Sequence, residues 1–222
     1  MLRTVYNEDH EAFRAAVREF LDRSVWPNVD SYIENKALPR EYWLEAGRQG
    51  LLGLDIPEEF GGMGAEDFRF NAVLSEELSR VNAALPSCHG IHSDITIPYV
   101  VKLGTQEQKE RWLPRAATGE VVAAIGMTEP SGGSDLAALK TTAVRDGDGW
   151  VLNGSMTFIT NGYSCDLVIV AARTSPEKKA RGISLFAVDT TLEGFSRGRK
   201  LDKVGQDEAD TAEMFSENIR LN

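Results

Sequence analysis

The stretch LPRAATGEVVAAIGMTEPSGGSD, residues 113–135, marks a change in the sequence pattern. Before it, apolar residues recur at three- and four-residue steps, as they do along one face of a helix. Within it, the apolar run VVAAIGM is followed by a turn-forming segment rich in glycine and serine. After it, short runs rich in β-branched and aromatic residues alternate with turn clusters, which is typical of strands. The sequence therefore predicts an α+β protein with a domain boundary near residue 120.

The first predicted domain, residues 1–120, is helical. A loop with several glycines and a proline interrupts the helical pattern at residues 50–65. Thr105 and Gln108 form a capping box that starts a short helix. The other helices are expected over residues 8–25, from Pro39 to Gly50, over 66–81 and over 87–103.

The second predicted domain, residues 121–222, is built of strands. The runs VVAAIGM, TTAV, WVLNG, TFIT, LVIVAAR, ISLFAV and TAEMF are separated by turn clusters such as RDGDG. This spacing fits an antiparallel barrel or sandwich, and no helical stripe lies between the runs as a βαβ pattern would require. We expect an antiparallel β-barrel that is incomplete at its C-terminal end.

Composition limits the partners. The 222 residues include 24 basic and 34 acidic side chains, which gives a net charge of −10. This balance argues against nucleic acid or an anionic membrane, because both favour clustered positive charge. The apolar runs are far shorter than the roughly 20 residues needed to cross a bilayer, and the first residues do not form a secretory signal, so no membrane insertion is expected. The two cysteines, Cys88 and Cys165, exclude a disulfide framework and fit a reducing cytoplasm.

The segment GMTEPSGGSD, residues 126–135, has two interpretations. Adjacent glycines beside serine, threonine and aspartate can turn successive N–H groups inward and cradle an anion such as a diphosphate, or the edge of an electron-rich ring. The same residue types are also the usual ones in a plain strand-to-strand turn. The segment has neither the G-x-G-x-x-G pattern of dinucleotide-binding folds nor the lysine of a phosphate loop. The residues alone leave both interpretations open.

The segment MTFITNG, residues 156–162, also has two interpretations. Strand alternation would place Phe158 and Thr160 on one face, so that the aromatic ring lies against a flat ligand and the hydroxyl touches its edge. The alternative is a strand that runs into an Asn-Gly hairpin turn, with Phe158 in the core.

Histidines and clustered cations carry weaker signals. His89 and His92 are one helical turn apart, but no carboxylate motif completes a metal site, so no metal is expected. His10 is expected to be solvated. A polar turn between two predicted strands is either a solvated loop or a contact for a phosphorylated ligand, and it carries Lys178, Lys179 and Arg181.

Five stretches together resemble the acyl-CoA dehydrogenase family of flavoenzymes. They are LLGLDIPEEFGGMG (residues 51–64), LGTQEQKERWLPRAATGE (103–120), GMTEPSGGSD (126–135), FITNG (158–162) and, more weakly, DTAEMFSENIRLN (210–222). The third stretch resembles the family's signature, and the order of the five also matches. The resemblance implies a helical N-terminal domain followed by a β-barrel middle domain, with the family's C-terminal helical domain absent.

The resemblance also implies that FAD binds against the middle domain without a Rossmann fold. Ser134 would touch both the diphosphate region of FAD and the acyl-CoA substrate, Phe158 would flank the flavin ring, and Thr160 would hydrogen-bond near the reactive N5. The full set of implied cofactor-binding residues is Met127, Thr128, Gly133, Ser134, Phe158, Ile159 and Thr160. The acyl tunnel would be lined by His92, Ile95, Ile97, Pro98 and Tyr99.

The implied reaction is FAD-dependent α,β-dehydrogenation of an acyl-CoA thioester to the trans-2-enoyl-CoA, an oxidoreductase step of fatty acid β-oxidation. Electron-transferring flavoprotein would reoxidise the flavin, and the complete protein would be a cytoplasmic homo-oligomer, a dimer or tetramer. The family's catalytic glutamate belongs to the third domain, so no catalytic residue is expected in this chain, which would be inactive alone. An alternative is a naturally short, non-catalytic FAD- or CoA-binding subunit of a hetero-oligomer.

Overall fold

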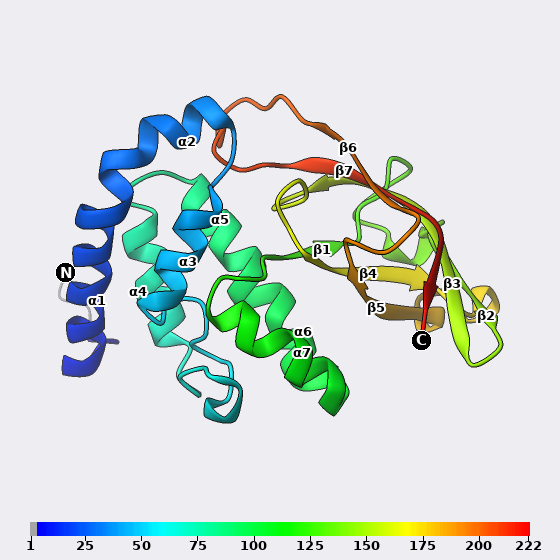
Figure 1. Ribbon diagram of the computed structural model, residues 1–222, viewed down its shortest axis with the longest axis horizontal. Coiled ribbons are helices and arrows are strands. Elements are labelled where there is room, and N and C mark those ends of the chain that lie inside the picture. The colour runs from blue at the N-terminus through cyan, green and yellow to red at the C-terminus, as the bar shows by residue number, and fades with distance from the viewer. Residues whose placement is uncertain (1–3) are drawn as a thin grey trace. The chain divides into compact units, whose positions relative to one another are not determined.

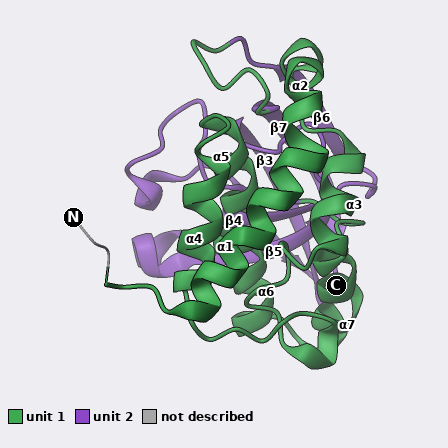
Figure 2. Ribbon diagram, turned by 90° about the vertical axis from the view of Figure 1, so that its left-hand side faces the viewer, with its two compact units in different colours: residues 1–122, 203–209 green, residues 123–202, 210–222 purple. Residues whose placement is uncertain are grey.

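The computed structural model describes residues 4–222 and divides into two compact units. The first comprises the chain up to Val122 together with Lys203–Ala209, and the second comprises Ala123–Asp202 together with Asp210–Asn222 (Figure 2). The first unit is helical and the second contains the sheet. No helix in the described part of the chain is long and apolar enough to cross a membrane.

Seven α-helices and several single turns make up the described part of the first unit (Figure 1). The first helix continues through a π-helical turn (η1) and a 3₁₀ turn (η2) into the second, and a further π-helical segment (η4) joins the fifth helix to the sixth. The elements are α1 (Glu8–Phe20), η1 (Leu21–Val25), η2 (Trp26–Asn28), α2 (Val29–Asn35), α3 (Arg40–Arg48), η3 (Glu58–Phe60), α4 (Arg69–Leu78), α5 (Ala84–Gly90), η4 (Ile91–Thr96), α6 (Ile97–Leu103) and α7 (Gln106–Ala117).

Side-chain capping boxes begin two of these helices, α1 and α7. The predicted capping box at Thr105 and Gln108 is confirmed, since the Gln108 amide donates to the Thr105 hydroxyl at 3.2 Å and the Thr105 amide donates to the Gln108 side chain at 3.0 Å. A second box starts α1, where the His10 amide donates to the Asn7 side chain at 3.1 Å. His10 is 1% exposed, so the expectation that it is solvated was wrong. The His10 Nδ1 accepts from the Asn7 amide and completes the box, and the ring packs against that of Phe70 with 4.5 Å between ring centroids.

The loop predicted at residues 50–65 is closed by its own backbone. Three hydrogen bonds cross it, from Met63 to the Gly53 carbonyl at 2.9 Å, from Gly64 to Ile56 at 2.8 Å and from Ala65 to Leu54 at 2.7 Å. Four of its apolar side chains are buried in the first unit: Leu51, Leu52, Leu54 and Ile56. The loop is therefore part of the helical core.

The second unit is one seven-stranded curled sheet, a half-barrel. The strand order is β1-β4-β2-β3-β7-β6, with β5 paired to β4. The strands are β1 (Ala123–Gly126), β2 (Thr142–Asp146), β3 (Gly149–Ile159), β4 (Leu167–Arg173), β5 (Ile183–Asp189), β6 (Phe195–Lys200) and β7 (Ala212–Leu221), with 3₁₀ turns η5 (Leu136–Ala138) and η6 (Pro176–Gly182).

The pairing is mostly antiparallel, as predicted, but not entirely. β1 pairs in parallel with β4, and Thr142 of β2 pairs in parallel with Arg173 of β4. Two predicted runs, WVLNG and TFIT, belong to the single long strand β3, and β6 was not predicted. The neighbouring strands β2, β3, β7 and β6 pair antiparallel, whereas β1 enters the sheet beside a strand that is distant in sequence.

Candidate functional site

Two of the sequence motifs meet in the second unit. The Thr157 amide donates to the Thr128 carbonyl at 2.9 Å, which joins the glycine loop after β1 to the end of β3. The Asn161 side-chain amide donates to the Ala123 carbonyl at 3.3 Å and ties the turn after β3 to β1. At Gly126 an added Cβ would lie 2.4 Å from the Met156 sulfur, so glycine lets the two strands approach closely.

The glycine loop is an open hairpin of its own. Glu129 and Gly132 exchange two backbone hydrogen bonds, at 2.9 and 3.0 Å. Within the described residues, the neighbouring N–H groups of Thr128, Gly133 and Ser134 donate to no protein acceptor. A Cβ at Gly132 would meet nothing within 4 Å, so the surface above the loop is open. Backbone donors in this arrangement suit an anionic or electron-rich ligand.

The Glu129 carboxylate stabilises this loop through hydrogen bonds. Its carboxylate accepts from the Lys140 amide at 2.8 and 3.0 Å, from the Thr141 amide at 2.5 Å and from the Ser131 hydroxyl at 3.1 Å. Burial alone would raise the pKa of this carboxyl, but the hydrogen bonds outweigh burial and hold the pKa below its usual value. Glu129 is a buried anion that fixes the loop.

Phe158 has the least usual conformation of the predicted site residues. Its φ is +60°, in the left-handed region that bulky residues rarely adopt, and its side chain is 67% exposed. The pairing of β3 with β7 shifts register between Met156 and Ile159, which places Phe158 in a β-bulge. Strain of this kind costs on the order of 1–3 kcal/mol and is concentrated at functional sites. An exposed aromatic ring held by a strained backbone fits a flat ligand.

The bulge changes the predicted alternation. Phe158 and Thr160 were expected on one face of a regular strand, but the strand ends at Ile159, which is 3% exposed and pairs with Ala212 of β7. Thr160 follows in the turn and is partly exposed. The hydroxyl is therefore placed by the turn after β3 and not by strand alternation.

One of the two alternative interpretations is excluded. The glycine loop connects β1 to β2, which are not neighbours in the sheet, so it is not a hairpin between paired strands, and its binding role stays a prediction. The Asn-Gly segment does not form a hairpin, because β3 pairs with β2 and β7 and not with β4. Phe158 does not lie in the core.

Sequence reasoning missed the residues that fix the turn after β3. Asp210, at the entry to β7, accepts from the Ser164 amide at 2.6 Å, and its backbone carbonyl accepts from the Tyr163 amide at 3.4 Å. Burial raises the pKa of the Asp210 carboxyl, although the hydrogen bonds from Ser164 oppose this. An aspartate at the start of a buried strand is the signal that could have identified it.

The histidines of the first unit are core residues. His89 lies between two partners, with Nε2 2.9 Å from the Leu51 carbonyl and Nδ1 3.2 Å from the Tyr42 hydroxyl. A carbonyl can only accept, so Nε2 carries a proton, and the lowered pKa of the ring favours its neutral form at pH 7. His92 Nε2 is 3.3 Å from the Ala116 carbonyl. Burial lowers the pKa of His89 to about 4 and that of His92 to about 3.

The residues suggested for an acyl tunnel differ in how exposed they are in the first unit. His92 and Ile97 are fully buried, whereas Ile95 is 43% exposed. Pro98 and Tyr99 are partly exposed at the start of α6.

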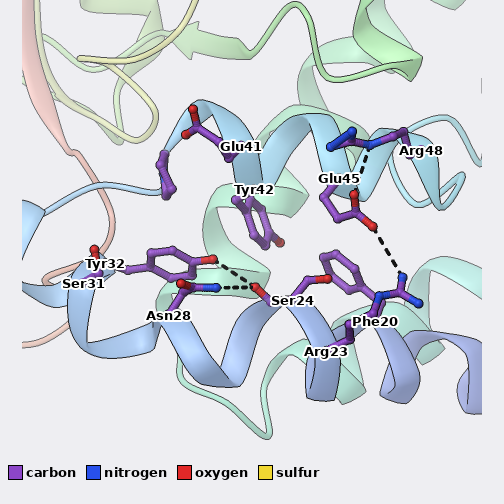
Figure 3. Close-up of a pocket in the computed structure, with 11 residues that line it drawn as sticks. Phe20, Arg23, Ser24, Asn28, Ser31, Tyr32, Glu41, Tyr42, Glu45 and Arg48 are labelled. Atoms are coloured by element: carbon purple, nitrogen blue, oxygen red, sulfur yellow. Dashed lines mark hydrogen bonds and ion pairs between the residues drawn. The ribbon is translucent and has the colours of Figure 1, made fainter.

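A separate pocket of about 550 Å³ lies between η1, α2 and α3 of the first unit (Figure 3). Glu45 occupies one side and pairs with Arg48 at 3.0 Å and with Arg23 at 3.4 Å. None of the predicted cofactor-binding residues lines this pocket.

The second unit thus presents an open glycine loop and an exposed aromatic residue on a half-barrel, and a helical unit precedes it in the chain. Two family models match the chain, described as "Acyl-CoA dehydrogenase, N-terminal domain" over residues 7–120 and "Acyl-CoA dehydrogenase, middle domain" over residues 124–219. The chain belongs to the acyl-CoA dehydrogenase family.

Individual relatives agree with this assignment. The chain is 45% identical to the mitochondrial long-chain specific acyl-CoA dehydrogenase of Mus musculus, over 99% of this chain and 51% of that protein. It matches the crystal structure of an acyl-CoA dehydrogenase from Geobacillus kaustophilus with a TM-score of 0.95 and 44% identity, over 99% of this chain and 58% of the other. The chain spans about half the length of the curated relatives it matches.

One similar structure contains the reduced cofactor. A glutaryl-CoA dehydrogenase from Mycobacterium smegmatis in complex with FADH2 matches with a TM-score of 0.89 and 32% identity, over 97% of this chain and 54% of the other. FAD as the cofactor of the family is thus confirmed by a relative.

Proposed function

We propose that this chain supplies the flavin- and thioester-binding surface for FAD-dependent α,β-dehydrogenation of an acyl-CoA. The observation that carries the proposal is the strained, exposed Phe158 beside the open backbone donors of the glycine loop. The residues present fit FAD, since an aromatic face, open N–H groups and a partly exposed hydroxyl are the contacts that a flavin ring and a diphosphate require.

Each residue then has a role that follows from its environment. Phe158 covers a face of the flavin ring, and Thr160 donates to the ring edge near N5. Met127 and Thr128 contact the ring at the point where β1 ends, and Gly133 and Ser134 present N–H groups to the diphosphate. Ile159 supports Phe158 indirectly, because it is buried and pairs the end of the bulge with β7. Ser134 is exposed and can also contact the thioester-bearing ligand.

The bound flavin supplies hydride acceptance in this chemistry. The protein's part is to orient the acyl chain, exclude water and hold a base at the α-carbon. We assign the base to neither buried carboxylate near the motifs, because Glu129 and Asp210 are both engaged in fixing loops. We expect the base outside the residues matched here.

Further properties follow from family membership. Electron-transferring flavoprotein is the proposed electron acceptor, the complete protein is proposed to be a dimer or tetramer, and fatty acid β-oxidation is the proposed role. Neither of the two cysteines is in a disulfide and both are buried, which suits a reducing compartment such as the cytoplasm, although several curated relatives are mitochondrial by name.

Anaerobic titration of the intact, flavin-loaded protein with acyl-CoA esters of increasing chain length tests this function. We expect the oxidised flavin absorbance to bleach with at least one ester, because electrons enter the flavin and no acceptor removes them. Val144→Ala is a matched control in the same unit, since Val144 is 63% exposed and outside the motifs. Flavin that stays oxidised with every ester would contradict the proposed function.

A further inference from the structure

The turn after β3 carries Thr160 and is tied at both ends to the start of β7. At one end Ile159, the last residue of β3, pairs with Ala212, the first residue of β7. At the other end the Ser164 amide donates to the carboxylate of Asp210 at 2.6 Å. Thr160 therefore lies in a turn that is fixed on either side of it to one short segment of the chain.

Asp210 contacts the turn with its backbone as well as its side chain. Its carbonyl accepts from the Tyr163 amide at 3.4 Å, next to the bond from the Ser164 amide to its carboxylate. Asp210 is 3% exposed, and a buried carboxylate needs hydrogen-bond donors in place of water. Bonds from backbone amides to a carboxylate are among the strong ones. The Asp210 side chain thus fixes the far end of the turn.

Between its two ends the turn is closed by its own hydrogen bonds. The Gly162 amide donates to the Ile159 carbonyl at 3.1 Å. The Cys165 amide donates to the Asn161 carbonyl at 2.9 Å. A Cβ at Gly162 would lie 2.6 Å from the Ile159 carbonyl oxygen, so the turn is as tight as glycine allows. Because a closed turn moves as a unit, a displacement at its far end also displaces Thr160.

Two cations of β6 support the same end of the turn. Lys200 Nζ lies 4.7 Å from the centroid of the Tyr163 ring, and Arg197 donates from Nη2 to the Cys165 carbonyl at 2.6 Å. Burial raises the pKa of the Asp210 carboxyl, and the positive charge of Lys200 opposes this shift. The basic residues of β6 therefore stabilise the turn together with the carboxylate.

We infer that Asp210 is a positioning residue for the flavin, which holds the Thr160 hydroxyl at the ring edge near N5 and thereby contributes to the redox potential of bound FAD. This inference rests on the proposed function, because it takes Thr160 to donate near N5. Asp210 acts through the turn and not by contact with the ring. A hydroxyl that the protein already holds in place loses little freedom when the ring binds, so its hydrogen bond stabilises the bound ring more than a mobile hydroxyl would.

A double-mutant cycle in the intact, flavin-loaded protein tests this inference, with Asp210→Ala, Thr160→Val and the two combined. Valine has nearly the shape of threonine, so Thr160→Val removes the proposed hydrogen bond and leaves the turn in place. The readout is the redox potential of the bound flavin, measured against a reference dye. The affinity for FAD and the thermal unfolding of the flavin-free protein are measured alongside, since a purely structural role would change only the unfolding.

Two variants serve as controls. Asp210→Asn keeps a side-chain oxygen that can accept from the Ser164 amide, so it should restore the wild-type potential. Asp189→Ala removes a carboxylate that accepts from the Thr191 amide at 2.9 Å, in the turn after β5 of the same unit, and should leave the potential unchanged. If Asp210→Ala does not fold, Asp210→Ser gives the same comparison with a side chain too short to replace the carboxylate.

We expect Asp210→Ala and Thr160→Val each to change the ratio of the affinities for reduced and oxidised FAD in the same direction. The expected change is roughly three- to tenfold, and tenfold is about 30 mV for a two-electron couple. The double variant should show no more than the larger single change, because Asp210 acts through the Thr160 hydroxyl. An unchanged potential in Asp210→Ala, or additive shifts in the double variant, would overturn the inference and leave the proposed function intact. A wild-type protein that holds no flavin would overturn both.

Discussion

The two glycine-rich loops of this chain are alike in composition and opposite in structure. The loop at residues 50–65 closes on itself, because its amides donate to its own carbonyls and its leucines enter the core. The loop at residues 126–135 leaves the amides of Thr128, Gly133 and Ser134 without a protein acceptor within the described residues. Glycine content alone does not indicate a binding loop; backbone donors left without a protein partner do.

The largest expected effect concerns the histidine that secures the closed loop. His89 donates to the Leu51 carbonyl of that loop and is neutral. Its folded-state pKa of about 4, and that of His92 of about 3, lie below the ordinary value of 6.5, so the unfolded chain binds more protons. Stability is complete above pH 6.5 and is lost as the pH falls towards 4 and then 3.

Between pH 7 and pH 5 the two histidines together should lower the free energy of unfolding by about 4 kcal/mol, about 2 kcal/mol for each, measured by urea unfolding of the intact protein at both pH values. His89→Gln and His92→Gln should each flatten the profile, since glutamine does not titrate in this range. Burial raises the pKa values of Asp55, Asp94 and Asp210, so these carboxyls stabilise the folded protein as the pH falls and oppose the histidines. The contribution of each histidine is therefore measured as the difference between the wild type and its glutamine variant. A profile that is the same in wild type and variants would show that these histidines do not decide acid stability.

The next prediction compares the effect on stability of an alanine substitution at one glycine of each loop. A Cβ at Gly62 in the closed loop would lie 2.1 Å from the Ile56 carbonyl oxygen, whereas a Cβ at Gly132 in the open loop would meet nothing within 4 Å. We expect Gly62→Ala to lower the free energy of unfolding by about 3 kcal/mol and Gly132→Ala to change it by less than about 0.5 kcal/mol. Thermal unfolding measures both, and equal losses would mean that the two loops are packed alike.

A smaller effect is expected at the anchor of the open loop. Glu129→Gln replaces a carboxylate that accepts from two backbone amides with a side chain that has only one acceptor atom. We expect a loss of about 2 kcal/mol in the free energy of unfolding. Glu213→Gln is the control, a carboxylate on β7 outside the loop. Unchanged stability in Glu129→Gln would show that the loop does not depend on this anion.

Local signals were sufficient for much of the fold. The capping box at Thr105 and the strands LVIVAAR and ISLFAV could be predicted because they depend on residues close in sequence. β6 could not, because its sequence FSRGRK is largely polar and becomes a strand only by pairing with β7. The parallel pairing of β1 with β4 also depends on residues distant in sequence.

The site shows the same division. The residue types of the glycine loop and of FITNG are enough to suggest a flat, anionic ligand, because aromatic, hydroxyl and glycine residues supply the contacts that such a ligand needs. The left-handed backbone of Phe158 and the support from Asn161 and Asp210 arise from tertiary contacts to β1, β7 and the turn after β3. Strand alternation could not predict a bulge whose position depends on the register with β7.

The central claim is that the exposed, strained Phe158 serves to bind the flavin ring. Phe158→Gly in the intact protein tests this claim most directly, since it separates the effect on FAD binding from the effect on folding. Glycine accepts a φ of +60° without strain, so we expect the free energy of unfolding of the flavin-free protein to stay the same or rise by about 1 kcal/mol. FAD should bind at least about tenfold more weakly, because an aromatic face is lost, and Phe158→Trp should retain binding. A variant that loses stability and keeps the wild-type affinity for FAD would contradict the account.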